Sequence, residues 1–317
     1  MHGLTTAMIR MRPKQHEPRP LRRAVLAAAV AAALAPVGRV WAGTSGRKRY
    51  DKGLLWRVER EGTPDSCIFG TIHVADARVA QPGANVLGIL SRSRYFVMEV
   101  AIDATVDPGV FDQEQLADDQ RLESIVGPDT YAQVRLILLE RGVPERSIAR
   151  MKPWVAMLAV ASSGTRDASL ALDERLLAAA RGARLRVQAL ELVEEQIAAF
   201  DTVPLASQVA LLRHALAYPG ALQAENESMI QAWRAGDLAA LVHFPARMEK
   251  HNPGIARHYD ELVRHIVHNR TILMHHRLTM PLRTGRLFVA VGALHLQGEK
   301  GLLALLEQDG YHMTRIG

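Results

Sequence analysis

The sequence predicts an α/β protein whose central sheet is mixed but largely parallel, is formed from two related halves and is flanked by helices, with a large helical insertion in the middle. Three observations lead to this fold class. Short apolar runs alternate with helical segments near both ends of the chain, which is the pattern of βαβ units. The frame Gly-x-x-His ends one such run near each end, at residues 70–73 and 292–295. Between these frames, residues 194–280 show helical periodicity almost throughout.

The first half begins with a predicted β-hairpin. Residues 54–59 and 67–72 are apolar runs, and residues 61–65 between them read Glu-Gly-Thr-Pro-Asp, which favours a turn. A loop containing Pro-Gly then leads to a helix expected over residues 84–91, and a short strand follows at residues 95–98. These elements make up the first α/β unit of the predicted fold.

The middle of the chain is predicted to be helical. Residues 128–141 are amphipathic, and a further helix over residues 153–161 opens with proline, which suits the first helical turn. Asp173 is expected to cap a helix over residues 174–181, because aspartate accepts hydrogen bonds from the free N–H groups at a helix start. A strand at residues 184–190 follows and completes a helix–turn–strand unit.

The C-terminal part of the sequence repeats the order of elements found near the start. Strand, helix and strand are expected at residues 286–291, 299–308 and 311–316. Because the Gly-x-x-His frame lies in the same place in both parts, we expect two related halves within a single domain over residues 43–317. The parts of that domain are an N-terminal half at about 53–192, a helical region at about 194–280 and a C-terminal half at about 286–317.

The N-terminus has the features of an export signal. A basic region ending at Arg22 and Arg23 precedes an alanine-rich run at residues 24–35, which is too short to span a bilayer comfortably. Residues 40–42 read Val-Trp-Ala and place small residues at the cleavage positions. We therefore expect residues 1–42 to be a cleavable bacterial signal, and the protein to be periplasmic or secreted without a transmembrane anchor. The general secretory and twin-arginine routes both fit, and an uncleaved anchor or a disordered tail is the alternative.

The charge of the chain excludes a nucleic-acid partner once its location is considered. The net charge is +6, but seven of the 39 basic residues and one of the 33 acidic residues lie in residues 1–42. The remainder holds 32 basic and 32 acidic residues and has no basic run interleaved with aromatics. Binding to nucleic acid depends on such basic surfaces, so this class of partner is not expected.

Two histidines and two glutamates follow predicted strands directly, and they are the candidate functional residues. His73, Glu99, Glu191 and His295 each lie at or just past the carboxyl end of an apolar run. In open α/β sheets, ligands bind in the crevice beyond those strand ends. His73, Glu99 and His295 supply the three ligands of a catalytic metal site that keeps one position for water. Glu191 is then a fourth ligand, a residue that holds a ligand in place, or a general base. The alternative is that each histidine only hydrogen-bonds a loop.

A polar stretch on a predicted long helix supplies two weaker candidates. Asn269 and Arg270 lie among histidines in this stretch. If they face the crevice, they can orient a carboxylate of the substrate or a ligand. A solvated or core-lining helix face explains the same stretch without any site. The two Gly-x-x-His segments do not fit a dinucleotide-binding loop, and a P-loop is absent from the sequence, so nucleotide use is not expected.

Taken in order along the chain, these residues resemble the TraB/GumN family, whose relatives include the Tiki metalloproteases. The segments that carry the resemblance are Phe-Gly-Thr-Ile-His-Val at residues 69–74, Met-Lys-Pro-Trp at 151–154, His-Asn-Arg at 268–270 and the block at 288–302. The resemblance implies a fold like that of the erythromycin-esterase and ChaN group. It also implies that His73, Glu99 and His295 are the functional residues. In the Tiki branch these support a peptidase dependent on manganese or cobalt, with zinc as an alternative ion.

The residues and the resemblance together predict an exported metal-dependent hydrolase. The expected reaction is cleavage of a peptide or protein substrate by water activated at a divalent metal ion. The alternative is a non-catalytic periplasmic protein on the same fold. Such a protein would bind a peptide or a haem-like ligand, or assist polysaccharide assembly.

Overall fold

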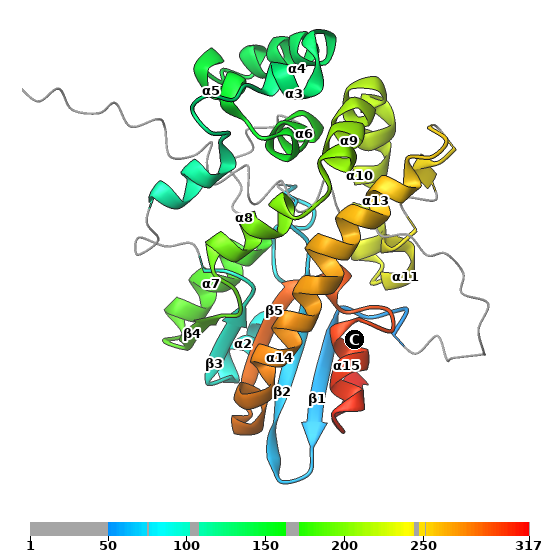
Figure 1. The fold of residues 1–317 in the computed structure, drawn as a ribbon. Helices are drawn as coiled ribbons and strands as arrows, with labels where there is room; N and C mark the ends of the chain where they lie inside the picture. The colour runs from blue at the N-terminus through cyan, green and yellow to red at the C-terminus, as the bar shows by residue number, and fades with distance from the viewer. Residues whose placement is uncertain are drawn as a thin grey trace, which may run out of the picture.

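The computed structural model has a six-stranded sheet at its centre (Figure 1). It describes residues 50–74, 76–101, 108–162, 171–243, 247–250 and 252–316, so the predicted export signal lies outside the described residues. The strands are β1 (Leu55–Arg60), β2 (Thr63–Thr71), β3 (Tyr95–Met98), β4 (Arg186–Ala189), β5 (Leu287–Gly292) and β6 (His312–Arg315). Their order across the sheet is β4-β3-β5-β2-β1-β6.

The sheet is mixed and mostly parallel, as the sequence predicts. Strands β4, β3, β5 and β2 are parallel neighbours, and β1 is antiparallel to both β2 and β6. The two strands that carry the Gly-x-x-His frames, β2 and β5, lie side by side, with Thr71 opposite Gly292. Met98 at the end of β3 is opposite Ala290. The carboxyl ends of these three strands therefore meet at one edge of the sheet.

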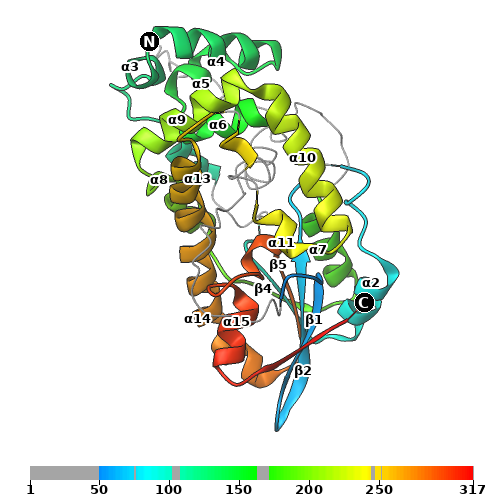
Figure 2. The same ribbon diagram turned by 90° about the vertical axis from the view of Figure 1, so that its right-hand side faces the viewer.

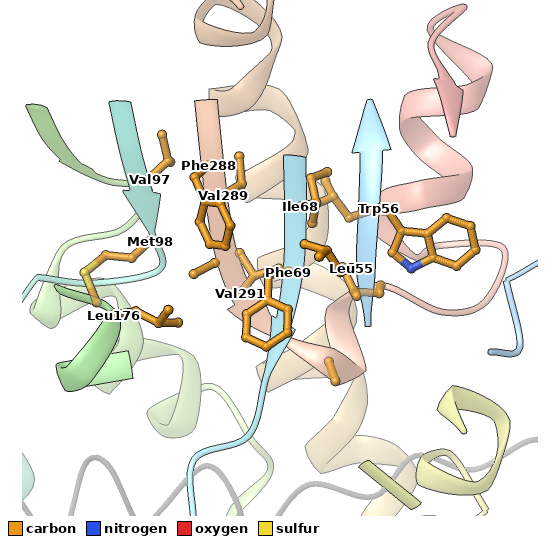
Figure 3. Packing of buried hydrophobic residues seen from close by; sticks show 14 of the residues in the cluster. Leu55, Trp56, Ile68, Phe69, Val97, Met98, Leu176, Phe288, Val289 and Val291 are labelled. Atoms are coloured by element: carbon orange, nitrogen blue, oxygen red, sulfur yellow. The ribbon is translucent and has the colours of Figure 1, made fainter. Parts of the chain in front are cut away.

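The central strands are buried on both faces, which explains their continuous apolar sequences. Every residue of β5 is buried, whereas the edge strands β4 and β6 are mostly exposed. Figure 3 shows Phe288 and Val289 of β5 between Val97 of β3 and Ile68 of β2. This apolar centre fixes the positions of the strand ends from which the candidate residues project.

Helices cover both faces of the sheet (Figure 2). On one face lie α2 (Ala84–Arg92) and α7 (Leu172–Gly182), and on the other lie α14 (Asn269–Thr284) and α15 (Leu302–Gln308). Buried apolar residues of all four helices pack into the same core as the strands. The α/β fold class is therefore confirmed. Among the residues that the structure describes, no helix is both long enough and apolar enough to cross a bilayer.

The remaining helices form a separate layer beyond the carboxyl ends of the parallel strands, at the top of Figure 1. Most of them share an apolar core of their own, whereas α11 and the C-terminal part of α10 pack into the core of the sheet, and Leu294 packs against both cores. The segments are η1 (Pro108–Glu114), α3 (Leu122–Val126), α4 (Pro128–Glu140), α5 (Glu145–Arg150), α6 (Pro153–Ala161), α8 (Val193–Asp201), α9 (Leu205–Ala217), α10 (Pro219–Arg234), α11 (Leu238–Leu241) and α13 (Ala256–Val263). The large helical part that the sequence predicts therefore covers the edge of the sheet at which the carboxyl ends of the parallel strands meet.

The Met-Lys-Pro-Trp segment has a structural role within this helical part. The indole N–H of Trp154 donates to Asp201 Oδ1 at 2.8 Å, and Lys152 Nζ lies 2.6 Å from Asp201 Oδ2. The Trp154 ring also stacks on Phe200, with ring centroids 4.8 Å apart. These contacts join the start of α6 to the end of α8, away from the strand ends.

Most predicted elements are present with shifted ends. The hairpin of β1 and β2 is confirmed, but its turn is shorter than predicted because β2 already begins at Thr63, which pairs with Arg60. The predicted strand at 184–190 is reduced to β4. The sheet interleaves strands from both ends of the chain, since β5 lies between β3 and β2. The relationship between the two halves and the bounds of the domain stay predictions.

Candidate metal centre

The structure brings the two predicted histidines to one carboxylate oxygen. His73 follows β2, Glu99 follows β3 directly, and His295 ends the short 3-10 segment η3 (Ala293–His295) after β5. The Nε2 atom of His73 lies 3.7 Å from Glu99 Oε1, and that of His295 lies 3.6 Å from the same oxygen. Glu99 and His295 are buried, and the His73 side chain is 15% exposed. Two imidazoles from opposite ends of the chain therefore face one buried carboxylate.

Glu99 is fixed as an ionised carboxylate by donors on both of its oxygens. The backbone N–H of Gly292 donates to Oε1 at 2.6 Å, and Arg270 Nη2 donates to Oε2 at 2.7 Å. Burial alone would raise the pKa of this carboxyl group, but its interactions with His295, Arg270 and His73 lower it well below its ordinary value. Glu99 therefore presents Oε1 to both histidines in its charged form.

Glu191 lies on the far side of Arg270 from the histidines. Arg270 is buried, and its Nη2 and Nε atoms donate to Glu191 Oε2 and Oε1 at 2.7 and 3.0 Å. Gln196 Nε2 adds a hydrogen bond of 3.3 Å to Glu191. Burial is the main cause that raises the pKa of Glu191. Of the three roles predicted for Glu191, this geometry favours holding: it orients Arg270, which in turn orients Glu99.

The two residues of the predicted pair, Asn269 and Arg270, lie in different environments. The preceding helical turn, η2 (Arg264–His268), is a π-helix in which the N–H of Asn269 donates to the carbonyl of Arg264. Such turns are frequent at functional sites because they rotate the residues that follow. Here Arg270 is buried and donates to the carboxylates of Glu99 and Glu191, whereas Asn269 is exposed. A substrate-orienting role for Asn269 stays a prediction.

Asp173 orients His73 and corrects the sequence analysis. Helix α7 begins at Leu172, so Asp173 lies inside its first turn and is not the N-cap. Its Oδ2 lies 2.9 Å from His73 Nδ1, and its Oδ1 accepts a hydrogen bond of 2.9 Å from Thr71 Oγ1. Burial lowers the pKa of His73, but Asp173 and Glu99 together outweigh burial and raise it to about 10. With Nδ1 committed to Asp173, the Nε2 atom is the one that faces Glu99.

Thr271 fixes the tautomer of His295. The Thr271 hydroxyl donates its single hydrogen to the carbonyl of Val267 at 2.8 Å, so it accepts from His295 Nδ1, 2.7 Å away. This network assigns the proton of the neutral ring to Nδ1 and leaves a lone pair on Nε2. Burial lowers the pKa of His295 to about 4, which favours that neutral form. His295 is therefore prepared to bind an electrophile through Nε2.

The space in front of these atoms is kept open by Gly292. A Cβ atom at this position would lie 3.2 Å from both Glu99 Oε1 and His73 Nε2, and 3.5 Å from His295 Cδ2. Gly292 does not have a positive φ, so close approach is the reason for glycine here. At Gly70, likewise, a Cβ would lie 2.7 Å from Leu296 Cδ1. Close approach of neighbouring atoms therefore explains glycine at both positions.

The donor atoms fit a divalent cation. Neither Nε2 atom of the two histidines has a hydrogen-bond partner within the described part of the chain, although both are buried. Imidazole and carboxylate ligands at about 2.0–2.2 Å in a tetrahedral site lie about 3.3–3.6 Å apart. The separations from Glu99 Oε1 to the two Nε2 atoms, 3.7 and 3.6 Å, are close to this spacing.

The candidate ligands do not form a preassembled metal site. Within the described ranges, no group of three or more His, Cys, Asp or Glu side chains forms a ready-made metal site.

Comparison with known proteins identifies the family. Residues 54–315 match the TraB/PrgY/gumN family. The chain belongs to this family. The family resemblance that the sequence analysis draws from its motifs is thereby confirmed. The segments that carried it include both Gly-x-x-His frames of this TraB/PrgY/gumN protein.

The curated relatives of this TraB/PrgY/gumN protein include metalloproteases. Metalloprotease TIKI1 of Danio rerio is 25% identical over 310 residues, covering 82% of this chain and 62% of that protein. The metalloprotease TIKI homolog of Amphimedon queenslandica is 23% identical over 313 residues, covering 83% of this chain and 61% of that protein. The chain thus spans about three-fifths of the length of these relatives. No solved structure is significantly similar to it.

The sequence analysis missed the two residues that orient the histidines of this TraB/PrgY/gumN protein. Asp173 has the ordinary signature of a helix cap, and Thr271 follows the Asn269–Arg270 pair that was singled out. Thr271 could have been considered because it directly follows Arg270. The two side chains are therefore close to each other on the same helix.

Replacing Thr271 with valine is expected to weaken metal binding by about 10–100-fold, because losing a partner that orients a ligand typically costs this much. Valine keeps the shape of threonine but cannot accept the hydrogen bond from His295. Titration of the purified protein with Mn²⁺, followed by calorimetry, measures the change. Thr271→Ser should restore binding. Thr279→Val is the control, because Thr279 lies on the same helix and bonds only the carbonyl of His275. Equal affinities for T271V and T279V would contradict the role.

Proposed function

We propose that the protein is a metal-dependent hydrolase that cleaves peptide bonds. The observation that supports this most directly is the convergence of His73 Nε2 and His295 Nε2 on Glu99 Oε1 at 3.7 and 3.6 Å. When bound, a divalent cation supplies Lewis-acid chemistry that polarises a carbonyl group and favours deprotonation of water. The relatives in Danio rerio and Amphimedon queenslandica, both named as metalloproteases, support the same reaction class.

The charge of the centre supports a divalent ion. The centre contains three carboxylates. Those of Glu99 and Glu191 pair with the guanidinium of Arg270, and that of Asp173 pairs with His73. With His73 protonated and His295 neutral, this leaves an excess of one negative charge, and the loss of the His73 proton that metal binding requires makes the excess two. Buried charge must be compensated, and a divalent cation compensates it fully. Imidazole and carboxylate donors without thiolate suit manganese, cobalt or zinc.

Each protein group has a distinct task in this proposal. His73, His295 and Glu99 hold the cation. Asp173 and Thr271 keep the two imidazoles turned so that Nε2 faces it. Protonation of Nε2 and metal binding compete for the same lone pair, so binding to His73 displaces a proton.

Arg270 and Glu191 act through Glu99 and not on substrate. Arg270 neutralises the second oxygen of Glu99, and Glu191 holds Arg270. The hydrogen bond of 2.9 Å from Thr71 to Asp173 similarly fixes the carboxylate that orients His73. In this scheme, Glu191 is a positioning residue and not a general base.

A cavity gives substrate access to the centre. It is lined by His73, Gly292 and His295 together with apolar residues of neighbouring helices. The carbonyl of a bound peptide can therefore reach the face on which the two Nε2 atoms lie.

We further propose that residues 1–42 direct export, which N-terminal sequencing of the protein from periplasm and medium would test.

The decisive experiment assays the purified full chain on a peptide library, first with a chelator and then with added Mn²⁺. Cleavage is expected to stop with the chelator, to return with Mn²⁺ and to be absent from His295→Ala. His275→Ala is the matched control, since His275 pairs only with Asp309, at 2.9 Å, on the outer surface. Cleavage indifferent to both the chelator and H295A would overturn the proposal. Binding of Mn²⁺ without cleavage of any peptide would favour the ligand-binding alternative.

A further inference from the structure

The cavity beside the two histidines has an apolar far wall. This wall is built mainly by α10 and α11, which lie next to the carboxyl edge of the sheet (Figure 2). Its apolar lining residues are Ile72, Met229, Trp233, Leu241 and Leu294. None of them takes part in the contacts that hold the candidate metal centre. The wall therefore requires a separate explanation.

The one polar atom in the side chains of this wall is occupied. The indole N–H of Trp233 donates to the carbonyl of Gly70 at 3.0 Å, at the start of the first Gly-x-x-His frame. The Trp233 ring also packs edge-on against Phe69, with centroids 6.3 Å apart. The ring thus has a fixed position and presents only carbon to the cavity. Met229 and Leu241, buried like Trp233, complete a surface that can bind only apolar groups.

The size of the cavity limits what it can hold. The cavity has a volume of about 40 Å³. One water molecule needs about 10–15 Å³, so the cavity has room for about three or four non-hydrogen atoms. Valine and leucine side chains have this number of non-hydrogen atoms, and an aromatic side chain has more. The chemistry and the volume therefore select the same class of group.

We propose that this cavity binds the valine- or leucine-sized aliphatic side chain of the substrate residue next to the cleaved bond. This inference rests on the proposed peptidase function for its role in cleavage, but not for the binding itself. His73 and His295 line the same cavity, so a side chain seated against Met229 and Leu241 brings its own backbone amide to the histidines. The cavity would thus decide which peptide bond reaches the centre.

Binding can be measured without any turnover. In the full chain labelled with ¹³C at the methionine methyl groups, N-acetyl-leucinamide is expected to shift the NMR signal of Met229 in a saturable manner. N-acetyl-phenylalaninamide should leave that signal unchanged. The signal of Met280, which is 68% exposed on α14, is the internal control and should not respond to either compound. An unshifted Met229 signal, or equal shifts with both compounds, overturns the inference.

Specificity supplies the second test. Leu241→Ala enlarges the cavity, so the ratio of kcat/KM for phenylalanine over leucine peptides is expected to rise by about tenfold or more, in line with the discrimination given by small changes in apolar pockets. Leu136→Ala, at a 61% exposed position on α4, should leave the ratio unchanged. A shifted Met229 signal without cleavage of any peptide would uphold the cavity and reject the hydrolase. Cleavage with an unshifted signal and an unchanged ratio would reject the cavity and uphold the hydrolase.

Discussion

Replacing Gly292 with alanine is expected to abolish metal binding while the fold stays intact. The added methyl group would lie 3.2 Å from Glu99 Oε1 and from His73 Nε2, in the space on which the donor atoms converge. The backbone at Gly292 has φ −53° and ψ 136°, which alanine adopts without strain. Because the methyl group both fills the space and pushes the donors apart, we expect affinity for Mn²⁺ to fall by about 100-fold or more.

The measurement is a Mn²⁺ titration of the two proteins, with thermal unfolding recorded in parallel. Gly88→Ala is the matched control, because the nearest atom to a Cβ at Gly88 is 4.0 Å away on Arg92. This control should bind Mn²⁺ normally and gain up to about 1 kcal/mol in stability, since alanine favours a helix over glycine. If G292A bound Mn²⁺ as tightly as G88A, the cation could not lie between these three side chains.

Replacing Arg270 with methionine is expected to destabilise the fold by about 3–5 kcal/mol, because removing one partner leaves buried charges uncompensated. Arg270 donates to Glu99 and to Glu191, and both carboxylates are buried. Methionine fills much of the volume but leaves two carboxylates without a counter-ion. Urea unfolding at neutral pH measures the loss.

Two further variants separate this charge effect from a packing effect. Arg270→Met combined with Glu191→Gln should recover part of the stability, since one of the two unpaired charges is removed. Arg277→Met is the control on the same helix: Arg277 pairs with Glu195 at 2.7 Å, but its side chain is 35% exposed. Exposed pairs contribute about 1 kcal/mol or less, so R277M should unfold almost like the parent protein. Similar losses for R270M and R277M would show that burial of the Arg270 pair has no special energetic role.

The positions of His73, Glu99 and His295 could be predicted because they depend on a local rule. A polar side chain directly after an apolar strand lies at the carboxyl edge of a parallel sheet, whatever the rest of the chain does. The apolar runs that form β2, β3 and β5 were recognisable because strands buried on both faces have continuous apolar sequences. Nothing beyond each strand and its direction was needed.

The partners of these residues depend on contacts that no local pattern encodes. Asp173 has the sequence signature of a helix cap, yet it is the second residue of α7. Its carboxylate binds Thr71 and His73 instead of capping the helix. Arg270 meets Glu99, 171 residues away in the chain, and this pairing could not be read from its helix. Thr271 reaches His295 after a π-helical turn, which shifts the helical phase that a regular pattern assumes.

The place of β5 in the sheet determines when the protein can become complete during its synthesis. Strand β5 lies between β3 and β2 and pairs with both, so these two strands become part of one sheet only when β5 is inserted. A ribosome must therefore translate past residue 295 before either the apolar interior or the donor set can close. Long-range pairing of this kind delays folding. An emerging chain consequently cannot trap a cation early, and a chain truncated before β5 would lack its central strand and one of its two imidazoles together.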